Sequence, residues 1–260
     1  MPVRVTTFRD DLSSSSRALV GMWVSSGSPL VAEICAGSGL DWLLIDGEHS
    51  PIGLESVVSL LQAVSGYPVT PMVRAPSDDS VVLKQLLDAG AQNLLIPMVD
   101  SAEQAAAAVR SVRYPPHGIR GVGSALARAA QWNRIEGYLT RADEFVSLFV
   151  QIESVAGVDA AAAIASVDGV DGVFVGPSDL AASMGLLGQQ THPDVTAAVL
   201  RTFKAVLAAG KPVGVNAFDP AQAQLYLDAG ATFVLVGADV ALLARGSEAL
   251  TDHYLNPRPQ

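Results

Sequence analysis

The stretches LDAGAQNLLIPM (residues 87–98) and LDAGATFVLVGAD (residues 227–239) are near copies of each other, and EICAGSGLDWLLID (residues 33–46) is a looser third copy. In each stretch a glycine ends a predicted helix, and an apolar strand begins within a few residues. Repeated helix–glycine–strand units are typical of a wound α/β fold. These three stretches therefore predict the fold class.

Apolar runs of strand length alternate with Ala-rich helical segments between residues 18 and 245. The runs are apolar throughout, as expected for parallel strands covered on both faces. Eight strands in 260 residues favour a closed (β/α)8 TIM barrel, which commonly needs about 250 residues. No G-x-G-x-x-G motif follows the first strand, which weakens the alternative of an open dinucleotide-binding sheet. The predicted strands are residues 18–24, 41–46, 68–74, 93–98, 145–153, 171–176, 211–218 and 232–237.

A single barrel domain is predicted to cover residues 1–260. Residues 1–17 form an N-terminal segment in this scheme, and residues 246–260 form a C-terminal tail. We expect a C-terminal helical extension that takes part in oligomer contacts. The one long insertion, residues 114–143, is predicted to contain a helix around residues 128–132.

Three serine–proline or aspartate–proline pairs predict helix starts, because each places a capping oxygen before a proline at the first helical position. They are Ser28-Pro29, Ser50-Pro51 and Asp219-Pro220. Ser101 with Gln104 fits a capping box.

Composition limits the function classes. Half of the residues are hydrophobic, which is enough for a large core, and the formal net charge is −10. That charge argues against nucleic acid and against anionic membrane surfaces as partners. The single cysteine, Cys35, excludes an intramolecular disulfide framework. The first residues lack the apolar core of a signal peptide, and no run reaches the length of a membrane span, so a cytoplasmic enzyme is expected.

Polar residues close otherwise apolar strands, and in such barrels the carboxyl ends of all strands meet at one rim. Gln151 and Glu153 are two residues apart on an extended run, so they face the same side. Together with Asp179, Glu153 indicates a site for a hard cation such as Mg²⁺ or Mn²⁺. The alternatives are an acidic residue at a helix start for Glu153 and a helix cap for Asp179. The full set of strand-end polar residues is Asp46, Glu48, His49, Arg74, Gln151, Glu153, Ser178, Asp179 and Asn216.

His49 and Arg74 are candidates for proton transfer and anion binding. A histidine directly behind a strand suits a general base near neutral pH, although a solvated loop imidazole is the alternative. Arg74 at a strand end would hold a carboxylate or an enolate oxygen. The glycine-rich GIRGVG segment (118–123) could offer backbone amides and Arg120 to an anion, or could be a surface loop.

The positions of the lysines bear on whether the chain could form a Schiff base with a substrate. The chain has only Lys84, Lys204 and Lys211. The first two lie within predicted helices, and the third opens a strand at the opposite rim. Covalent catalysis through a Schiff base needs a desolvated lysine in the site, so that route is disfavoured.

The chain resembles the HpcH/HpaI aldolase family over nearly its whole length. The resemblance rests on long stretches: GMWVSSGSP, LIDGEHSP, MVRAP, LKQLLDAGAQNLLIPMVDSAEQA, PPHGIRGVG, ARAAQWNRI, QIES and VGPSDLAASMG. It implies a class II pyruvate aldolase that cleaves a 4-hydroxy-2-oxo acid, such as 4-hydroxy-2-oxoheptane-1,7-dioate, to pyruvate and an aldehyde. It also implies a homohexamer built as a trimer of dimers, and a place in the catabolism of aromatic compounds.

Site roles follow from the resemblance residue by residue. Glu153 and Asp179 match metal ligands for Mg²⁺ or Mn²⁺, with Co²⁺ or Zn²⁺ as further candidates, and no organic cofactor is implied. His49 matches the catalytic base, and Arg74 matches the group that stabilises the enolate. Asp88 matches an acid that raises the basicity of the histidine and would reach it from a neighbouring subunit, with Asp46 as the local alternative. The positions that match or are expected to form the substrate-binding set are Gln151, Ser178 (where many relatives have Ala), Asp179, Arg74 and Asn216.

Several other enzymes would need the same metal site. These are a 2-dehydro-3-deoxyglucarate-type aldolase, an oxaloacetate decarboxylase and an enzyme similar to macrophomate synthase. A catalytically silent metabolite-binding barrel would lack a ligand or a base, and neither is missing here.

Overall fold

The barrel predicted from the sequence is confirmed. The computed structural model describes residues 6–255. Within them each strand pairs in parallel with the next, and β8 pairs with β1, so the sheet closes. The strands are β1 (Leu19–Val24), β2 (Trp42–Asp46), β3 (Thr70–Arg74), β4 (Asn93–Ile96), β5 (Ser147–Ile152), β6 (Gly172–Val175), β7 (Val213–Asn216) and β8 (Phe233–Ala238).

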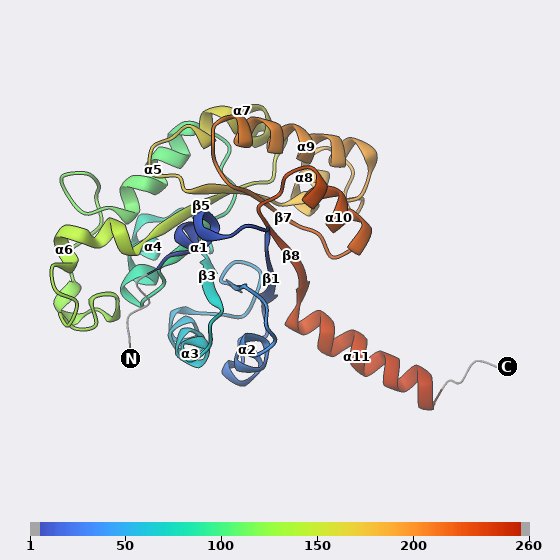
Figure 1. Ribbon diagram of the computed structural model, residues 1–260, viewed down its shortest axis with the longest axis horizontal. Helices are drawn as coiled ribbons and strands as arrows, with labels where there is room; N and C mark the ends of the chain where they lie inside the picture. Colours follow the sequence, from blue (N-terminus) through green and yellow to red (C-terminus); the bar gives the residue numbers. More distant parts are fainter. Residues whose placement is uncertain (1–5, 256–260) are drawn as a thin grey trace.

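Helices follow the strands and surround the barrel (Figure 1). The α-helices are α1 (Phe8–Ser14), α2 (Pro29–Ala36), α3 (Leu54–Val64), α4 (Ser80–Asp88), α5 (Ala102–Val112), α6 (Tyr138–Arg141), α7 (Val155–Ala165), α8 (Pro177–Ser183), α9 (Pro193–Ala208), α10 (Pro220–Asp228) and α11 (Asp239–Tyr254). Two 3₁₀ turns, η1 (Ser124–Leu126) and η2 (Arg128–Ala130), lie in the insertion, and a third, η3 (Ala142–Phe145), spans its end. The helix expected around residues 128–132 is thus a single 3₁₀ turn, because Gln131 and Trp132 adopt left-handed backbone conformations that end it.

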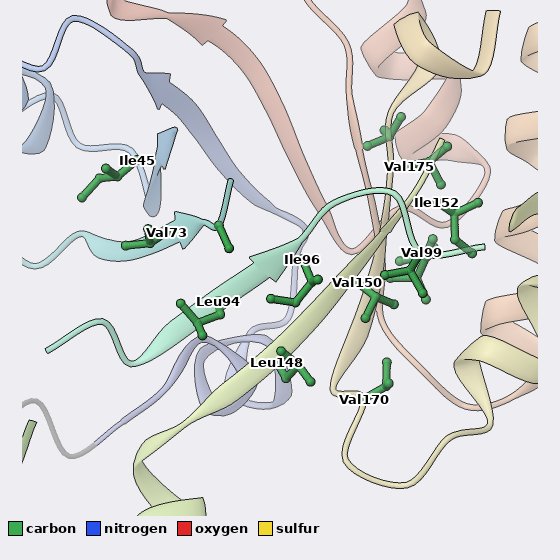
Figure 2. Packing of buried hydrophobic residues seen from close by; sticks show 14 of the residues in the cluster. Ile45, Val73, Leu94, Ile96, Val99, Leu148, Val150, Ile152, Val170 and Val175 are labelled. Carbon is green, nitrogen blue, oxygen red and sulfur yellow. The ribbon is translucent and has the colours of Figure 1, made fainter. Parts of the chain in front are cut away.

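The outer core lies between the sheet and the surrounding helices. It is built from branched aliphatic side chains, which pack well on a pleated surface. Figure 2 shows part of this layer, in which buried side chains from β2 to β6 and nearby loops pack together: Ile45, Val73, Leu94, Ile96, Val99, Leu148, Val150, Ile152, Val170 and Val175.

The barrel interior is filled by the alternate residues of the same strands, and it is rich in aromatic side chains. Trp42 and Phe233 are fully buried there, and a glycine on a neighbouring strand faces each of them. A Cβ atom at Gly21 would lie 2.6 Å from the Trp42 ring, and one at Gly214 would lie 2.3 Å from the Phe233 ring. These glycines make room for the large rings, so the interior is packed and is not a pore.

Helix α1 closes the end of the barrel at which the strands begin. Phe8 is fully buried, and its ring centroid lies 5.0 Å from that of Trp42 and 5.4 Å from that of Phe149. Its backbone N–H donates to Oδ1 of Asn93 at the start of β4 (2.7 Å). The N-terminal segment therefore completes the interior of the barrel.

Two of the three predicted proline helix starts are confirmed. Ser28 accepts from the N–H of Val31, and Asp219 accepts from the N–H of Gln222. The start at Ser50-Pro51 is wrong, because α3 begins at Leu54 and the Ser50 hydroxyl donates to Asp46 instead.

The capping box at α5 forms in part. The Ser101 hydroxyl accepts from the N–H of Gln104 (3.2 Å), as predicted. The Gln104 side chain accepts from the N–H of Asp100 (2.7 Å), one residue before the cap.

Helix α11 extends away from the body of the barrel (Figure 1). Residues 246–254, expected as part of a tail, continue this helix. Several large apolar side chains on it are exposed, including Leu242 (63%), Leu243 (57%) and Leu250 (62%). Within residues 6–255, no helix combines the length and the hydropathy needed to cross a bilayer.

Phe8→Ala should lower the free energy of unfolding by about 3–5 kcal/mol, because it removes a fully buried ring from the closed end of the barrel. Chemical denaturation would measure the change. Phe218→Ala is the control, since Phe218 is 50% exposed and its truncation should cost much less. Equal losses of unfolding free energy in the two variants would contradict the role of Phe8 in closing the barrel interior.

Candidate active site

The strand-end polar residues lie in register at one rim of the barrel. Inward positions alternate along each strand, so Asp46 continues the line of Leu44, and Gln151 continues the line of Phe149. Asp46 pairs in register with Arg74 on the next strand. Glu153 directly follows β5 and is 2% exposed. The rim of the barrel at which these strands end therefore carries a buried polar layer above the aromatic interior.

Arg74 is surrounded by two carboxylates. Its Nε and Nη2 atoms lie 2.9 and 2.8 Å from Oδ1 of Asp46, and its Nη1 atom lies 2.8 Å from Oε2 of Glu48. The contact with Glu48 is an ion pair without good hydrogen-bond geometry. Because Arg has five N–H donors, these three contacts leave two N–H groups for a ligand.

Asp46 also fixes the loop that carries His49. Its Oδ1 accepts from the backbone N–H groups of Glu48 (3.1 Å) and His49 (3.3 Å), and its Oδ2 accepts from the Ser50 hydroxyl (3.2 Å). The imidazole of His49 is 64% exposed, and its Nε2 lies 3.8 Å from Oε2 of Glu48. Asp46 therefore holds the backbone of His49, while Glu48 is the carboxylate beside its ring.

Glu153 is held by two donors. Its Oε1 accepts from the backbone N–H of Met98 (2.8 Å), and its Oε2 accepts from the side-chain amide of Gln151. Met98 has a φ of 55°, which is unusual for a residue with a side chain, and this conformation presents its N–H to the carboxylate. The buried Oε1 of Gln151 has no hydrogen-bond partner among the described residues, so it is free to accept from a ligand.

The pKa of Glu153 is raised to about 7, chiefly by burial and to a lesser extent by the nearby carboxylates of Asp179 and Glu48, against the lowering effect of the Met98 and Gln151 donors. Burial likewise raises the pKa of Glu48, although Arg74 and His49 oppose the shift. Asp179 lies in the first turn of α8 and is exposed, yet it is close enough to influence both groups. Three carboxylates therefore repel one another at this rim.

A divalent cation fits this donor set. Carboxylate oxygens are the ligands that Mg²⁺ and Mn²⁺ prefer, and a cation would offset both the burial and the repulsion that raise the pKa of Glu153. Glu153 and Asp179 would hold it. No cluster of three or more acidic, histidine or cysteine side chains arranged for a metal occurs in residues 6–255. Water or substrate would fill the remaining positions.

The predicted substrate-binding residues occupy different environments. Ser178 is exposed at the start of α8, beside Asp179. Asn216 ends β7, and its Oδ1 accepts from the indole N–H of Trp23 (2.8 Å), so this oxygen already has a protein partner.

Asp88 lies away from the rest of the predicted site, because it ends α4 at the rim where strands begin. Its Oδ1 lies 2.7 Å from Nη2 of Arg120. Arg120 is buried and also lies against Tyr114 and Tyr138, so its guanidinium serves this cluster and is not open to an anion as the glycine-rich segment suggested. Burial raises the pKa of Tyr114 to about 12.

Sequence reasoning assigned no role to Trp23, Glu48 or Met98. Trp23 could have been found, because it stands two residues after Gly21 and is therefore the last inward position of β1. Glu48 was noted only as a strand-end residue. Met98 contributes a backbone N–H, which has no residue-specific signal.

Comparisons with known proteins agree with this geometry. Residues 19–246 match the model of the HpcH/HpaI aldolase/citrate lyase family. A hydroxypyruvate/pyruvate aldolase of Cupriavidus necator is 51% identical over 93% of this chain and 90% of its own. A 4-hydroxy-2-oxo-heptane-1,7-dioate aldolase of Salmonella dublin is 50% identical over 95% of this chain and 94% of its own.

A solved structure is also similar. The crystal structure of an HpcH/HpaI aldolase/citrate lyase family protein from Burkholderia cenocepacia superposes with a TM-score of 0.91, at 41% identity, over 95% of this chain and 98% of that one. The family match and the two relatives, on a barrel with an acidic, arginine-containing rim, show an enzyme of the carbon–carbon lyase class, a pyruvate-dependent aldolase. The chain belongs to the HpcH/HpaI aldolase/citrate lyase family.

Glu153→Gln should stabilise the metal-free protein at alkaline pH. The pKa of Glu153 is raised from 4.5 to about 7 on folding, so the stability that it contributes below pH 4.5 is lost as pH rises through 7. The variant lacks this loss and should be more stable at pH 8 by up to about 3 kcal/mol. Denaturation between pH 4.5 and 8 would measure the difference, and the exposed Glu103→Gln should not show this gain. Parallel pH profiles for wild type and Glu153→Gln would show that the buried carboxyl is not strained.

Proposed function

We propose that this enzyme is a divalent-metal-dependent aldolase that reversibly cleaves a 4-hydroxy-2-oxo acid to pyruvate and an aldehyde. The observation that supports this best is the pairing at one rim of a buried carboxylate, Glu153, with a guanidinium, Arg74, that keeps N–H groups free. Such a rim suits a reaction in which negative charge develops on an oxo acid. The family and the two relatives point to the same reaction class.

The proposed cleavage assigns one task to each side chain. His49 takes the proton of the C4 hydroxyl, and the carboxylate of Glu48 lies beside its ring. The C3–C4 bond then breaks, its electrons form the enolate of pyruvate, and the aldehyde leaves. The free N–H groups of Arg74 face the enolate oxygen, and C3 takes up one proton from the imidazolium of His49 or from water that the imidazolium reprotonates, which gives pyruvate and restores neutral His49. When bound by Glu153 and Asp179, a divalent ion supplies Lewis-acid stabilisation of the enolate charge.

Lysine positions support a route without a Schiff base. Lys84 and Lys204 lie in α4 and α9, as predicted. The Nζ atom of Lys211 donates to the carbonyl of Val170, before β6 begins, at the rim opposite to the site. None of the three is placed to form a covalent bond with a substrate at the acidic rim.

The two named relatives are 51% and 50% identical to this chain, so sequence identity favours neither relative's substrate. 4-Hydroxy-2-oxoheptane-1,7-dioate is the first substrate to assay, and hydroxypyruvate is the first alternative to pyruvate as donor. A 2-dehydro-3-deoxyglucarate-type substrate belongs to the same class. Condensation of each donor with a panel of aldehydes would rank them.

Chelation and the two ligand variants test the function. The wild-type enzyme with Mg²⁺ or Mn²⁺ should release pyruvate from the 4-hydroxy-2-oxo acid. Removal of the metal, Glu153→Gln or Asp179→Asn should each lower the rate by about 10³-fold or more, because Lewis-acid stabilisation is worth several kcal/mol. A coupled assay for pyruvate would measure it.

Asp168→Asn is the matched control, since the Asp168 side chain is 96% exposed and lies outside the site. Full activity after chelation would reject the metal-dependent scheme. Faster decarboxylation of oxaloacetate than cleavage of any 4-hydroxy-2-oxo acid would favour the decarboxylase alternative, which needs the same rim.

We also propose that the chain forms a homo-oligomer, a hexamer in the form that the resemblance implies. The exposed leucines of α11 form an apolar surface that another copy of the chain would cover. Asp88, which is only 27% exposed and paired with Arg120, could then approach the His49 of a neighbouring subunit.

Leu242→Glu combined with Leu243→Glu should shift the protein toward smaller species in light scattering, because charges would replace the apolar surface of α11. Leu187→Glu is the control, since Leu187 is 80% exposed on a different part of the molecule. A wild-type monomer, or an unchanged oligomer in the double variant, would contradict the role of α11.

A further inference from the structure

Arg74 has an aromatic neighbour as well as its two carboxylates. The central carbon of its guanidinium lies 4.3 Å from the centroid of the Trp23 ring. Trp23 is on β1 and Arg74 is on β3, so this contact crosses the mouth of the barrel. The carboxylates hold nitrogen atoms of the guanidinium, whereas the ring faces the cation itself. This arrangement restrains the plane of the guanidinium as well as its position.

Trp23 is itself held from the far side of the barrel. Its indole N–H donates to Oδ1 of Asn216 on β7 (2.8 Å). Its ring also packs on Phe174 of β6, with centroids 6.4 Å apart and planes at 82°. Trp23 is only 9% exposed, so it has little freedom to tilt. A chain of contacts therefore runs from β7 through β1 to β3.

The contacts of Trp23 affect the balance of charge around Arg74. Two carboxylates, Asp46 and Glu48, compete for one guanidinium, and each could draw it away from a ligand. The electron-rich face of an indole attracts the cation without occupying an N–H donor. Trp23 thus opposes the pull of the carboxylates without occupying the remaining N–H groups of Arg74.

We propose that Trp23 and Asn216 are positioning residues that fix the plane of Arg74, so that its free N–H groups face the anionic oxygen of a bound oxo acid. Asn216 then acts through Trp23, and Trp23 acts through Arg74. This inference rests on the proposed function for the identity of the anion. It gives Asn216 a role different from direct substrate binding.

The test is a double-mutant cycle between Trp23 and Arg74. Trp23→Leu removes the aromatic face and the tether, and should lower kcat about 100-fold, since a small misplacement of a charge-stabilising group can cost that much. Asn216→Ala removes only the tether, and Trp23→Phe removes the tether but keeps a smaller aromatic face; each should lower kcat about tenfold. KM should change less than kcat, because the positioning acts on charge that develops during the reaction.

The energetic coupling between Trp23 and Arg74 distinguishes positioning of Arg74 from a purely structural role of Trp23. In the Arg74→Lys background, Trp23→Leu should lower kcat by less than a further twofold, because the planar group that it positions is gone. A structural role would lower kcat by the same factor in both backgrounds, and that outcome would overturn the inference. Trp132→Leu is the matched control. The central carbon of the Arg134 guanidinium lies 5.4 Å from the centroid of the Trp132 ring, a similar cation–π pair outside the barrel mouth.

A binding measurement keeps this test independent of aldolase activity. Oxalate is a planar dianion that resembles the enolate of pyruvate, and calorimetry would give its Kd for the Mg²⁺-loaded protein. Trp23→Leu should raise this Kd at least tenfold in the wild-type background and less than twofold in the Arg74→Lys background. If Trp23→Leu does not fold, Trp23→Phe and Asn216→Ala complete the same cycle, with circular dichroism as the check.

The outcomes distinguish the two proposals. Coupled oxalate binding without any aldol cleavage would support the positioning role and reject the proposed function. Aldol cleavage without coupling would keep the function and overturn the positioning role. Unchanged oxalate affinity in Trp23→Leu, or no binding of oxalate by the wild-type protein, would also overturn it.

Discussion

Alternation of side chains along eight closed parallel strands decides which residues can meet in this protein. Each strand sends every second side chain to the barrel axis, and the same line that supplies Trp42 and Leu44 supplies Asp46 at the mouth. Large rings fill the interior only because glycines on neighbouring strands leave space for them. The polar rim therefore rests on the tightly packed aromatic interior of the barrel, and this packing limits the movement of the rim side chains.

The rim is costly for the folded chain in the absence of a ligand. Glu153 is buried, and its raised pKa reflects both the loss of water and the nearness of other carboxylates. A fold optimised for stability alone would avoid this arrangement. The strained backbone of Met98, which holds Glu153 in place, points the same way. Such costs are typical of sites that bind a charged partner.

Much of the site could be predicted from the sequence because it obeys simple rules of position. Asp46, Arg74, Gln151 and Glu153 end apolar runs, and strand ends of a parallel barrel converge at one rim. The start of α3 was wrongly predicted, since a serine before proline looks like a cap. In the fold Asp46 binds that serine, and the helix begins later. A local cap pattern fails where another residue, here Asp46 four positions earlier, binds the same hydroxyl in the folded chain.

The sequence by itself determined the fold class, the family and the residues available at the mouth, because periodicity and strand-end chemistry are local properties of the chain. Tertiary structure alone decided the partners: the ring of Trp23 on Arg74, the N–H of Met98 on Glu153, and Arg120 on Asp88. These pairs come from different segments, and each depends on the tilt and register of the closed sheet. Spacing along the chain carries no record of that register, so it had to be seen in three dimensions.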